Sequence, residues 1–220
     1  TPIAISDELP STMPSANPAP YQFWQFYPTR APAPEWVPDV VAAFRDAAPE
    51  IDSRIKHGVT SDAALAVLRA ALVVLGFEIE ASKAASGKIR RPVLFGENGS
   101  ARVAYEVDGF HPELNIVLEI EAGRGAAGNA DYRDLIRTSL IVDADYLILG
   151  MMLEYRSGKT TIRSYERTRD QIDAIYASDR LKLPFTGILL ASRLLTQPQI
   201  ATGVSAALRS APGVSRSSAA

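Results

Sequence analysis

The 220-residue sequence contains no cysteine and only two histidines. Without cysteine it can form neither a disulfide bond nor a thiolate zinc site, and the absence fits the reducing cytoplasm, where we expect the protein to reside. No apolar run approaches the roughly 18–20 residues of a membrane span, so no membrane partner is expected. The formal net charge is only −2, so the molecule as a whole does not attract nucleic acid, and any polyanion site must be a local patch.

Apolar residues make up 47% of the sequence, which is typical of a globular protein with a substantial core. Composition varies along the chain, because nine of the fifteen prolines lie before residue 39, whereas the C-terminal residues are rich in Ser, Ala and Gly. Proline fixes φ and removes a backbone donor, so the N-terminal part should be extended or irregular. We therefore expect a proline-rich arm over residues 1–35, a folded domain over 36–195 and a flexible tail over 196–220.

A cluster of aromatic residues, from Tyr21 to Tyr27, lies within the expected arm. Our main interpretation is that the arm packs these rings onto the core of the folded domain. A partner-binding or base-stacking arm is the sharper alternative, and a disordered arm is the third.

Hydrophobic spacing divides the middle of the chain into alternating helices and strands. The expected helices cover about 39–48, 61–75, 129–141 and 165–178, and the expected strands about 77–80, 102–110, 115–122, 146–153 and 187–191. Residues 82–100 are expected to be a polar excursion without regular structure. Strands separated by helices predict an α/β fold, with a mixed β-sheet flanked by helices on both faces.

The segment from Glu106 to Glu121 reads as two strands joined by a short turn, and three of its carboxylates are expected on one face. A strand alternates its side chains, so Glu119 and Glu121 share one side of the second strand. A turn centred on residues 111–115 brings Asp108 of the first strand opposite Glu119. Acids held this close raise one another's pKa, so such a cluster usually needs a cation, and oxygen ligands suit Mg²⁺ or Mn²⁺.

Together, the order of elements and the acids resemble the restriction-endonuclease-like superfamily, the PD-(D/E)xK nucleases. In that family a helix precedes a strand hairpin that supplies an Asp and then (D/E)-x-K, and a helix and a strand follow. Asp108 matches the Asp and Glu119 the D/E, whereas Glu121 stands where the family usually has Lys, as in type II restriction endonucleases with E-x-E. The resemblance covers about residues 61–153, and residues 132–150 are also similar to uncharacterised bacterial members.

The resemblance implies a restriction-endonuclease-like fold and a Mg²⁺- or Mn²⁺-dependent nuclease that hydrolyses phosphodiester bonds of DNA. Asp108, Glu119 and Glu121 would be catalytic, with Asp108 and Glu119 as metal ligands, and the metal would activate a water. Glu121 cannot supply the positive charge of the family's Lys, but it could bind metal or act as a general base. A cutter of both DNA strands would need a second copy of the chain, which implies a homodimer. The preceding region offers further candidate acids: Glu50, Glu78 and Glu80.

Basic residues around the acids are the candidate nucleic-acid contacts. The stretch from Lys88 to Arg91 contains few acids, and one of its cations could replace the missing Lys. Arg133 and Arg137 lie one helical turn apart, where like charges repel, so phosphate contact would explain them. A solvated helix face that Asp131 and Asp134 partly neutralise is the simpler interpretation of that pair. The candidate nucleic-acid-binding residues are Lys88, Arg90, Arg91, Arg124, Arg133 and Arg137.

Two features near the acids have plainer interpretations. His111 could contact a metal or a phosphate, but a turn histidine without such a role is the simpler interpretation. The glycine-rich segment 123–128 opens a helix, yet it matches neither G-x-G-x-x-G nor a Walker sequence, so we interpret it as a flexible connection.

Two other functional classes remain open. A non-catalytic nucleic-acid- or protein-binding module that retains the nuclease fold is favoured by Glu121 and by the slightly acidic balance of charge. Hydrolysis by paired carboxylates without metal, as in glycosidases, would also bring two acids together. The order of elements does not resemble common glycosidases, and only two tryptophans are available for stacking on sugars.

Overall fold

A computed structural model describes residues 21–52, 56, 58–121, 129–157, 160–178 and 180–196, which belong to one compact unit, Tyr21–Thr196. The α-helices described are α1 (Trp36–Ile51), α2 (Ser61–Val74), α4 (Ala130–Ser139) and α5 (Ser164–Ser178). The strands are β1 (Tyr21–Tyr27), β2 (Glu78–Ile79), β3 (Ile89–Phe95), β4 (Ala101–Val107), β5 (Gly109–His111), β6 (Ile116–Ile120), β7 (Tyr146–Met151), β8 (Tyr155–Ser157), β9 (Thr160–Ile162) and β10 (Gly187–Thr196). Within these residues, no helix combines the length and the apolar character needed to cross a membrane.

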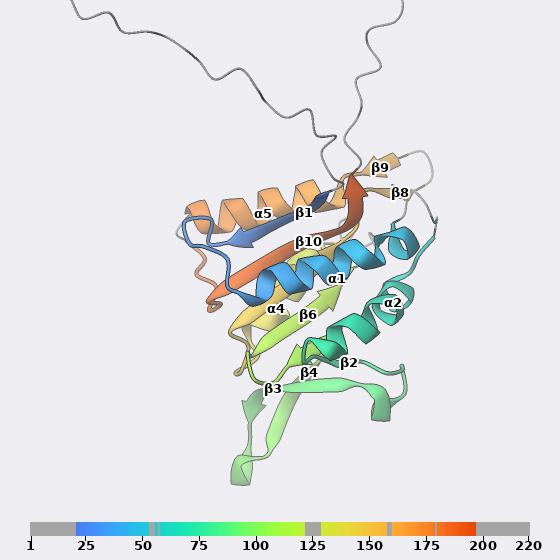
Figure 1. Cartoon of the computed structure of the whole chain (residues 1–220). Helices are drawn as coiled ribbons and strands as arrows, with labels where there is room; N and C mark the ends of the chain where they lie inside the picture. The colour runs from blue at the N-terminus through green and yellow to red at the C-terminus, as the bar shows by residue number, and fades with distance from the viewer. Residues whose placement is uncertain are drawn as a thin grey trace, which may run out of the picture. The chain divides into compact units, whose positions relative to one another are not determined.

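Six strands form one mixed sheet in the order β1-β10-β7-β6-β5-β2 (Figure 1). The central strands β10, β7 and β6 run parallel to one another. At one edge β1 pairs antiparallel with β10, and at the other β5 and β2 continue antiparallel from β6. Two further pairs, β3–β4 and β8–β9, form separate antiparallel ribbons.

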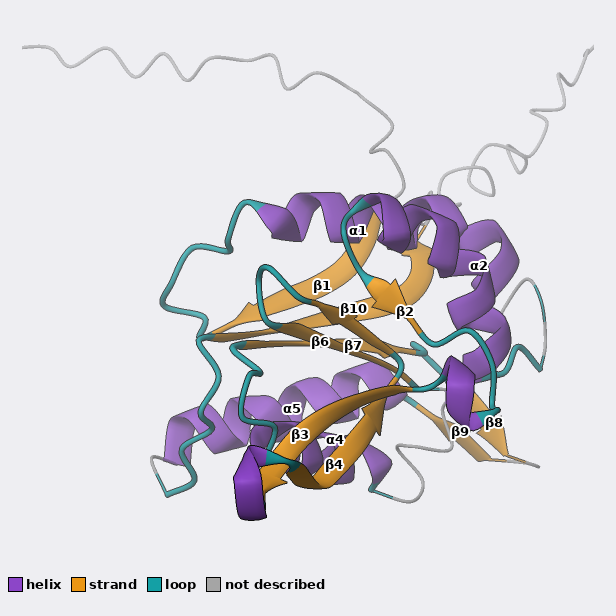
Figure 2. Cartoon of the chain, turned by 90° about the horizontal axis from the view of Figure 1, so that it is seen from below, coloured by secondary structure: helices purple, strands orange, loops and turns teal. Residues whose placement is uncertain are grey.

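Helices cover both faces of the six-stranded sheet, so the expectation of a mixed α/β fold is confirmed. Figure 2 shows α1 and α2 on one face and α4 and α5 on the other, with the β3–β4 ribbon on the α4 side. Strand alternation divides the buried residues between two cores. Leu118 and Ile148 pack with α1 and α2, whereas Val117 and Leu149 pack on the opposite face.

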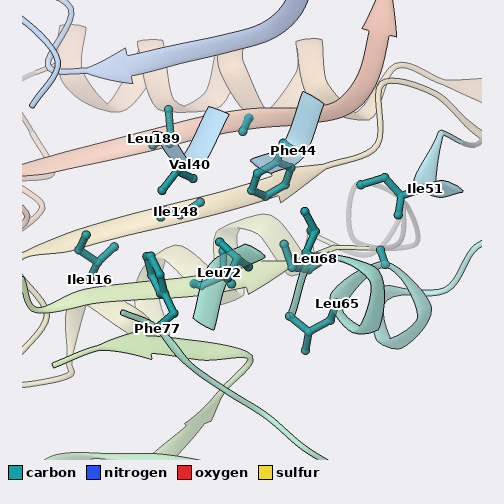
Figure 3. Close-up of a cluster of buried hydrophobic side chains, with 14 of the residues drawn as sticks. Val40, Phe44, Ile51, Leu65, Leu68, Leu72, Phe77, Ile116, Ile148 and Leu189 are labelled. Carbon is teal, nitrogen blue, oxygen red and sulfur yellow. The ribbon is translucent and has the colours of Figure 1, made fainter. Parts of the chain in front are cut away.

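A cluster of apolar side chains fills the space between the sheet and the helices α1 and α2 (Figure 3). Phe44 of α1 and Leu68 and Leu72 of α2 are fully buried, and the four-residue spacing of the two leucines puts them on one face of the helix. Gly150 of β7 permits the close approach of α1, because a Cβ atom there would lie 2.9 Å from Cε1 of Phe44.

The aromatic cluster is an edge strand of the sheet, so the folded unit begins at Tyr21 and the expected boundary at residue 36 does not match it. Its alternating rings enter both cores. Phe26 lies on the α1 side, whereas Tyr27 is fully buried on the other face and stacks on Tyr176 of α5 at 5.5 Å. The many prolines around this segment obscured its strand pattern, because they lie beside the strand and not within it.

The expectation of an irregular excursion over residues 82–100 was wrong, because this segment contains β3. The charged residues of this segment obscured the strand pattern, although one face of β3 packs against the core. Ile89 and Val93 pack against the core on the α4 side, and Arg91 between them pairs with Asp143. The short strands β8 and β9 were also not expected.

Helix ends differ from expectation by a few residues. The first helix was expected to begin after Asp39 and to stop before Pro49, but α1 runs from Trp36 through Pro49 to Ile51. A proline in the last turn removes only one helical hydrogen bond, so the turn can persist. At α2 the cap is Thr60 and not Ser61, because its hydroxyl accepts a hydrogen bond from Ala63 N–H at 3.2 Å.

Candidate functional site

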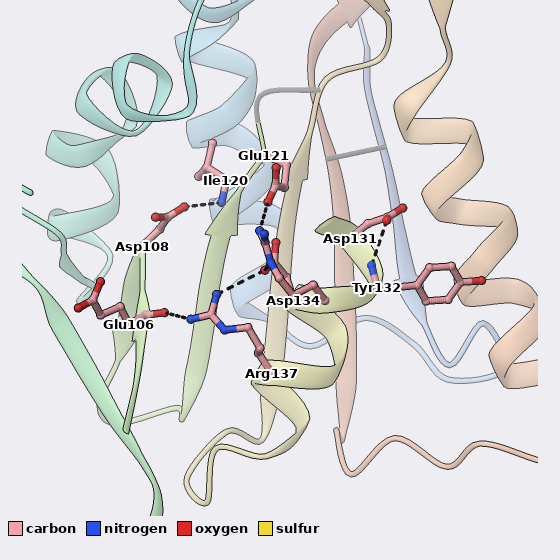
Figure 4. A network of polar contacts seen from close by, with 9 residues as sticks. Glu106, Asp108, Ile120, Glu121, Asp131, Tyr132, Asp134 and Arg137 are labelled. Carbon is pink, nitrogen blue, oxygen red and sulfur yellow. Dashed lines mark hydrogen bonds and ion pairs between the residues drawn. The ribbon is translucent and has the colours of Figure 1, made fainter. Parts of the chain in front are cut away.

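The register of the β5–β6 hairpin brings two of the three expected acids together. Gly109 lies opposite Leu118, so the next position of this antiparallel register sets Asp108 opposite Glu119, as the sequence predicts. The backbone N–H of Ile120 donates a hydrogen bond of 2.8 Å to Oδ2 of Asp108, which fixes the carboxylate against β6 (Figure 4). Asp108 itself separates β4 from β5, so the expected strand 102–110 is interrupted at the acid.

Burial raises the pKa of all three acids. The pKa of Asp108 rises to about 6, because loss of solvent outweighs the hydrogen bond from Ile120, and the negative charge of Glu80 adds to the shift. Glu119 lies half-buried between acids, and its pKa is raised well above the usual range by burial and by the charges of Asp108 and Asp134. Ionised together, these groups therefore destabilise the fold that holds them.

A fourth acid, Asp134 of α4, completes the group that we call the acid cluster: Asp108, Glu119, Glu121 and Asp134. Its side chain is 2% exposed, and one of its oxygens, Oδ2, has no hydrogen-bond partner among the described residues. Asp131, one turn earlier, is also buried but accepts hydrogen bonds from Tyr132 N–H and Thr168 Oγ1, both at 3.0 Å. Asp134 is thus buried, and its ion pairs with Arg133 and Arg137 are made through its other oxygen, Oδ1.

Asp134 was expected only to neutralise neighbouring arginines on a solvated face. Residues 131, 134, 135 and 138 share one helical face, and in the structure all four are buried. The expected apolar stripe was misassigned. Leu135 and Ile141 are buried, whereas Tyr132, Ile136 and Leu140 are exposed.

The pKa of Glu121 is set by burial and by two neighbours of opposite charge, Asp134 and Arg133. Burial and a hydrogen bond with Asp134 raise the pKa of Glu121 to about 8, and the positive charge of Arg133 limits the rise. A proton on Glu121 allows the two carboxyl groups to hydrogen-bond instead of repelling each other. Near neutral pH this pair can therefore take up or release a proton.

Two of the six expected nucleic-acid contacts, Arg133 and Arg137, lie against the acid cluster. Arg133 approaches Glu121 at 3.7 Å and Asp134 at 3.3 Å. Arg137 lies 3.7 Å from Asp134, donates a hydrogen bond of 3.1 Å to the carbonyl of Glu106 and extends over the ring of Tyr105. Both arginines thus partly neutralise the acids, and neither is a bare surface cation.

Lys88 lies at the other side of the cluster and is held by acids. Its ammonium group lies 2.8 Å from Glu80 and 3.7 Å from Glu106, and the charges of these acids and of Asp108 help to raise its pKa. Glu80 is 9% exposed, and its backbone N–H donates to the carbonyl of Asp108 at 2.9 Å. Of the three further acids considered from sequence, Glu80 is the one bonded to the Asp108 backbone.

Among the described residues, the other two expected contacts, Arg90 and Arg91, are not gathered with the cluster. Arg91 pairs with Asp143 and lies over the ring of Phe110, 3.7 Å from its centroid, so it has a structural role in the α4-side core. Arg90 is exposed on β3. Arg124 and the glycine-rich segment 123–128 lie outside the described residues.

The contacts of His111 are those of a turn histidine that packs against its neighbours. Its ring is 7% exposed, its Nδ1 accepts a hydrogen bond from Leu114 N–H at 3.3 Å, and it packs edge-on against Phe77 at 5.1 Å. Gly76 leaves room for it, because a Cβ atom there would lie 2.7 Å from Nε2 of His111, and φ at Gly76 is +95°. His111 therefore stabilises the turn and the end of α2.

The carboxylates of the acid cluster provide only some of the ligands that a metal ion needs. Across the described residues, no group of three or more Asp, Glu or His side chains could hold a metal ion. Mg²⁺ is usually bound through one or two protein carboxylates together with waters and substrate phosphates, so a complete protein cage is not required. Asp108 and Glu119, which lie opposite each other across the hairpin, are the donors that such an ion would meet.

Comparisons with family models, with curated proteins and with solved structures gave no significant match. Function must therefore be argued from the acid cluster itself. The class of site that it defines is a group of largely buried acids at the end of a central strand, flanked by arginines and a lysine, in which the pKa values of Asp108, Glu119 and Glu121 are raised.

Proposed function

We propose that the protein is a Mg²⁺-dependent nuclease of the restriction-endonuclease-like type that hydrolyses phosphodiester bonds of DNA. The observation that supports it most is the cross-strand pair of Asp108 and Glu119, whose pKa values are both raised by burial among other acids. Acids in a central strand are costly unless they are paired or bind a cation. A divalent ion would offset that cost and would bring a phosphate group to the cluster.

Asp108 and Glu119 would hold the ion, and a bound Mg²⁺ would polarise the scissile phosphate and lower the pKa of a water. The hydrogen bond from Ile120 N–H leaves Asp108 Oδ1 available as a ligand. Glu121, with its pKa raised to about 8, would accept the proton of the attacking water and share it with Asp134. Arg133 and Arg137 would contact the substrate phosphates from α4.

Lys88 is a candidate for the positive charge that the family's Lys supplies at position 121. It enters from the start of β3 and remains charged beside Asp108, because Glu80 and Glu106 raise its pKa. Cleavage of both strands of a duplex would require a homodimer, which we include in the proposal.

A non-catalytic module that binds nucleic acid or protein is the second candidate. The observation that favours it is the set of internal ion pairs: Arg133 and Arg137 already contact acids of the cluster. In that case the cations are structural, and the acids bind no metal. Binding of a DNA duplex without any cleavage, with Mg²⁺ or Mn²⁺ present, would support this second function.

The test is a cleavage assay on supercoiled plasmid and on linear duplex with Mg²⁺ and with Mn²⁺. Asp108→Asn and Glu119→Gln keep size and remove charge, so both should fold and lose at least about 100-fold in rate. Asp46→Asn on α1 is the matched control, because that acid is exposed and pairs with Arg45. Wild-type activity in either cluster variant would refute the metal-ligand roles.

Glu121→Lys separates the two roles considered for position 121. The introduced ammonium group would lie near the unpartnered Asp134 oxygen, so the variant should fold. Retained or raised cleavage would show that the Lys of the common motif works here. Loss of cleavage, with duplex binding intact, would assign Glu121 as a ligand or a base.

A further inference from the structure

A fully buried arginine on β10, Arg193, connects three separate parts of the backbone. It is 1% exposed and is one of the largest fully buried side chains. Its Nη1 donates a hydrogen bond of 3.1 Å to the carbonyl of Glu121, and its Nη2 donates to the carbonyls of Ile51 and Val59, each at 3.5 Å. Its Nε has no hydrogen-bond partner among the described residues.

An arginine at this position is costly for the fold. Burial lowers the pKa of Arg193 to about 10, so the group is still charged at neutral pH and lacks the solvent that a surface arginine has. An apolar side chain of similar volume would fill the space without that cost, and such replacements of buried ionic groups often stabilise a protein. The position of the three carbonyl contacts indicates what this buried charge can do.

The hydrogen bond from Arg193 to the carbonyl of Glu121 lies just past the end of the pairing between β6 and β7. The last registered pair between β6 and β7 is Ile120 with Gly150, so Glu121 lies one residue beyond it. The N–H of Glu121 still donates to the carbonyl of Gly150 at 2.9 Å, and Arg193 donates to the Glu121 carbonyl from the other side. Both backbone polar groups of Glu121 are thus held, although the residue lies outside the strand.

The same guanidinium group binds α1 and α2 to this point. Ile51 is the last residue of α1, and Val59 lies two residues before the start of α2. A planar guanidinium with several donors in fixed directions can reach all three carbonyls at once, which a single ammonium group does less well. Arg193 therefore fixes Glu121 relative to both helices.

We propose that Arg193 is a positioning residue of the acid cluster, which holds the backbone of Glu121 so that its carboxylate stays against Asp134 and Arg133. The positioning itself is independent of the proposed nuclease function, and only its consequence for metal binding rests on that function. Loss of Arg193 frees the Glu121 carbonyl and lets the carboxylate leave the cluster, while the strand pairs before it remain.

Native-state amide hydrogen exchange of the full chain tests the positioning. Arg193→Met removes all three hydrogen bonds. Arg193→Lys keeps the positive charge but lacks the planar guanidinium group with its several donors. We expect the Glu121 amide to exchange at least about tenfold faster in Arg193→Met, with a smaller increase in Arg193→Lys, whereas the amides of Ile148 and Leu149 in β7 stay protected. Arg45→Met on the surface of α1 is the control and should leave all three amides unchanged.

Unchanged protection of Glu121, or a loss of protection spread evenly over β6 and β7, would overturn the proposal, because an even loss indicates a general role in stability. If Arg193→Met does not fold, the exchange rate of the Glu121 amide relative to those of Ile148 and Leu149 in Arg193→Lys distinguishes a positioning role from a general role in stability.

Titration of Mn²⁺ into the same proteins separates this inference from the proposed function. Selective exchange at Glu121 in a protein whose wild type binds no Mn²⁺, with or without a DNA duplex, supports the positioning and refutes the metal site. Wild-type Mn²⁺ affinity in both Arg193 variants, with unchanged exchange, refutes the positioning and leaves the metal site standing.

Discussion

The two faces of β6 differ in what they contribute to the protein. Leu118 and Ile120 face the helices α1 and α2 within a cluster of buried apolar side chains. On the other face the strand begins with the buried Val117 and continues with Glu119, towards Glu121 and Asp134. One strand thus stabilises the fold through one face and holds carboxylates on the other at a cost to stability.

This difference distinguishes a structural face from a candidate functional one. The apolar side chains gain free energy from leaving water, whereas the acids lose solvation and have pKa values displaced upward. Strongly perturbed pKa values near specific charged partners mark functional-site candidates. Within the described residues, the acid cluster is therefore a place where a bound cation would offset a cost to folding.

The largest expected effect comes from the apolar face. Leu118→Ala removes a fully buried side chain and leaves a cavity between β6 and the helices, so the free energy of unfolding should fall by about 3 kcal/mol. Urea denaturation measures it. A loss below about 1 kcal/mol would mean that this face packs less tightly than described.

The next effect has the opposite sign and depends on pH. The pKa of Glu121 is raised from 4.5 to about 8 in the folded chain, so the folded state keeps a proton that the unfolded state releases in this range. Wild-type stability should therefore fall as pH rises from about 4.5 to 8. Glu121→Gln should lessen this fall and be more stable than wild type at pH 8, by on the order of 2 kcal/mol.

Urea denaturation of wild type and Glu121→Gln at pH 5 and pH 8 provides the measurement. Glu50→Gln on the surface of α1 is a suitable control and should leave the pH dependence unchanged. Parallel stability profiles for wild type and Glu121→Gln would contradict the account.

A smaller loss is expected at the cations of the cluster. Arg137→Ala removes the ion pair with buried Asp134 and the hydrogen bond to the Glu106 carbonyl, so stability at pH 8 should fall by about 1 kcal/mol. The loss should shrink at pH 5, because the charge of Arg137 also offsets that of Glu119, whose raised pKa keeps it more protonated at the lower pH. An equal loss at both pH values would indicate that packing on Tyr105 accounts for the effect.

The smallest effect is expected on the outer surface of α4. Ile136 is 44% exposed although it follows the fully buried Leu135, so Ile136→Ala should change stability by less than about 0.5 kcal/mol. Leu135→Ala, the matched comparison, should cost several-fold more when both are measured by thermal denaturation. A large loss at Ile136 in concentrated protein only would reveal that a second copy covers this surface.

Sequence patterns predicted the central part of the fold well, because its elements are strongly periodic or continuously apolar. The strand over Tyr146–Met151 and the leucine spacing of α2 follow directly from such patterns. The opposition of Asp108 and Glu119 also followed, since the short turn leaves one register that buries the apolar residues.

What sequence reasoning missed depends on contacts between distant segments. β3 was hidden because Arg91 points inward and is neutralised by Asp143, which lies 52 residues away. Asp134 was taken for a surface acid, because its burial depends on how α4 packs against β6. Arg193 gave no local signal at all, since its carbonyl partners lie in segments more than 70 residues earlier.

The proposed binding of a divalent cation by the acid cluster can be measured by isothermal titration of Mg²⁺ and Mn²⁺ into wild type, Asp108→Asn and the control Asp46→Asn, each with and without a short DNA duplex. We expect binding by wild type and by Asp46→Asn and none by Asp108→Asn. Binding should be tighter at pH 8 than at pH 6, because the ion displaces protons from acids with raised pKa values. Absence of binding by wild type in all conditions, or equal binding by Asp108→Asn, would contradict the proposal.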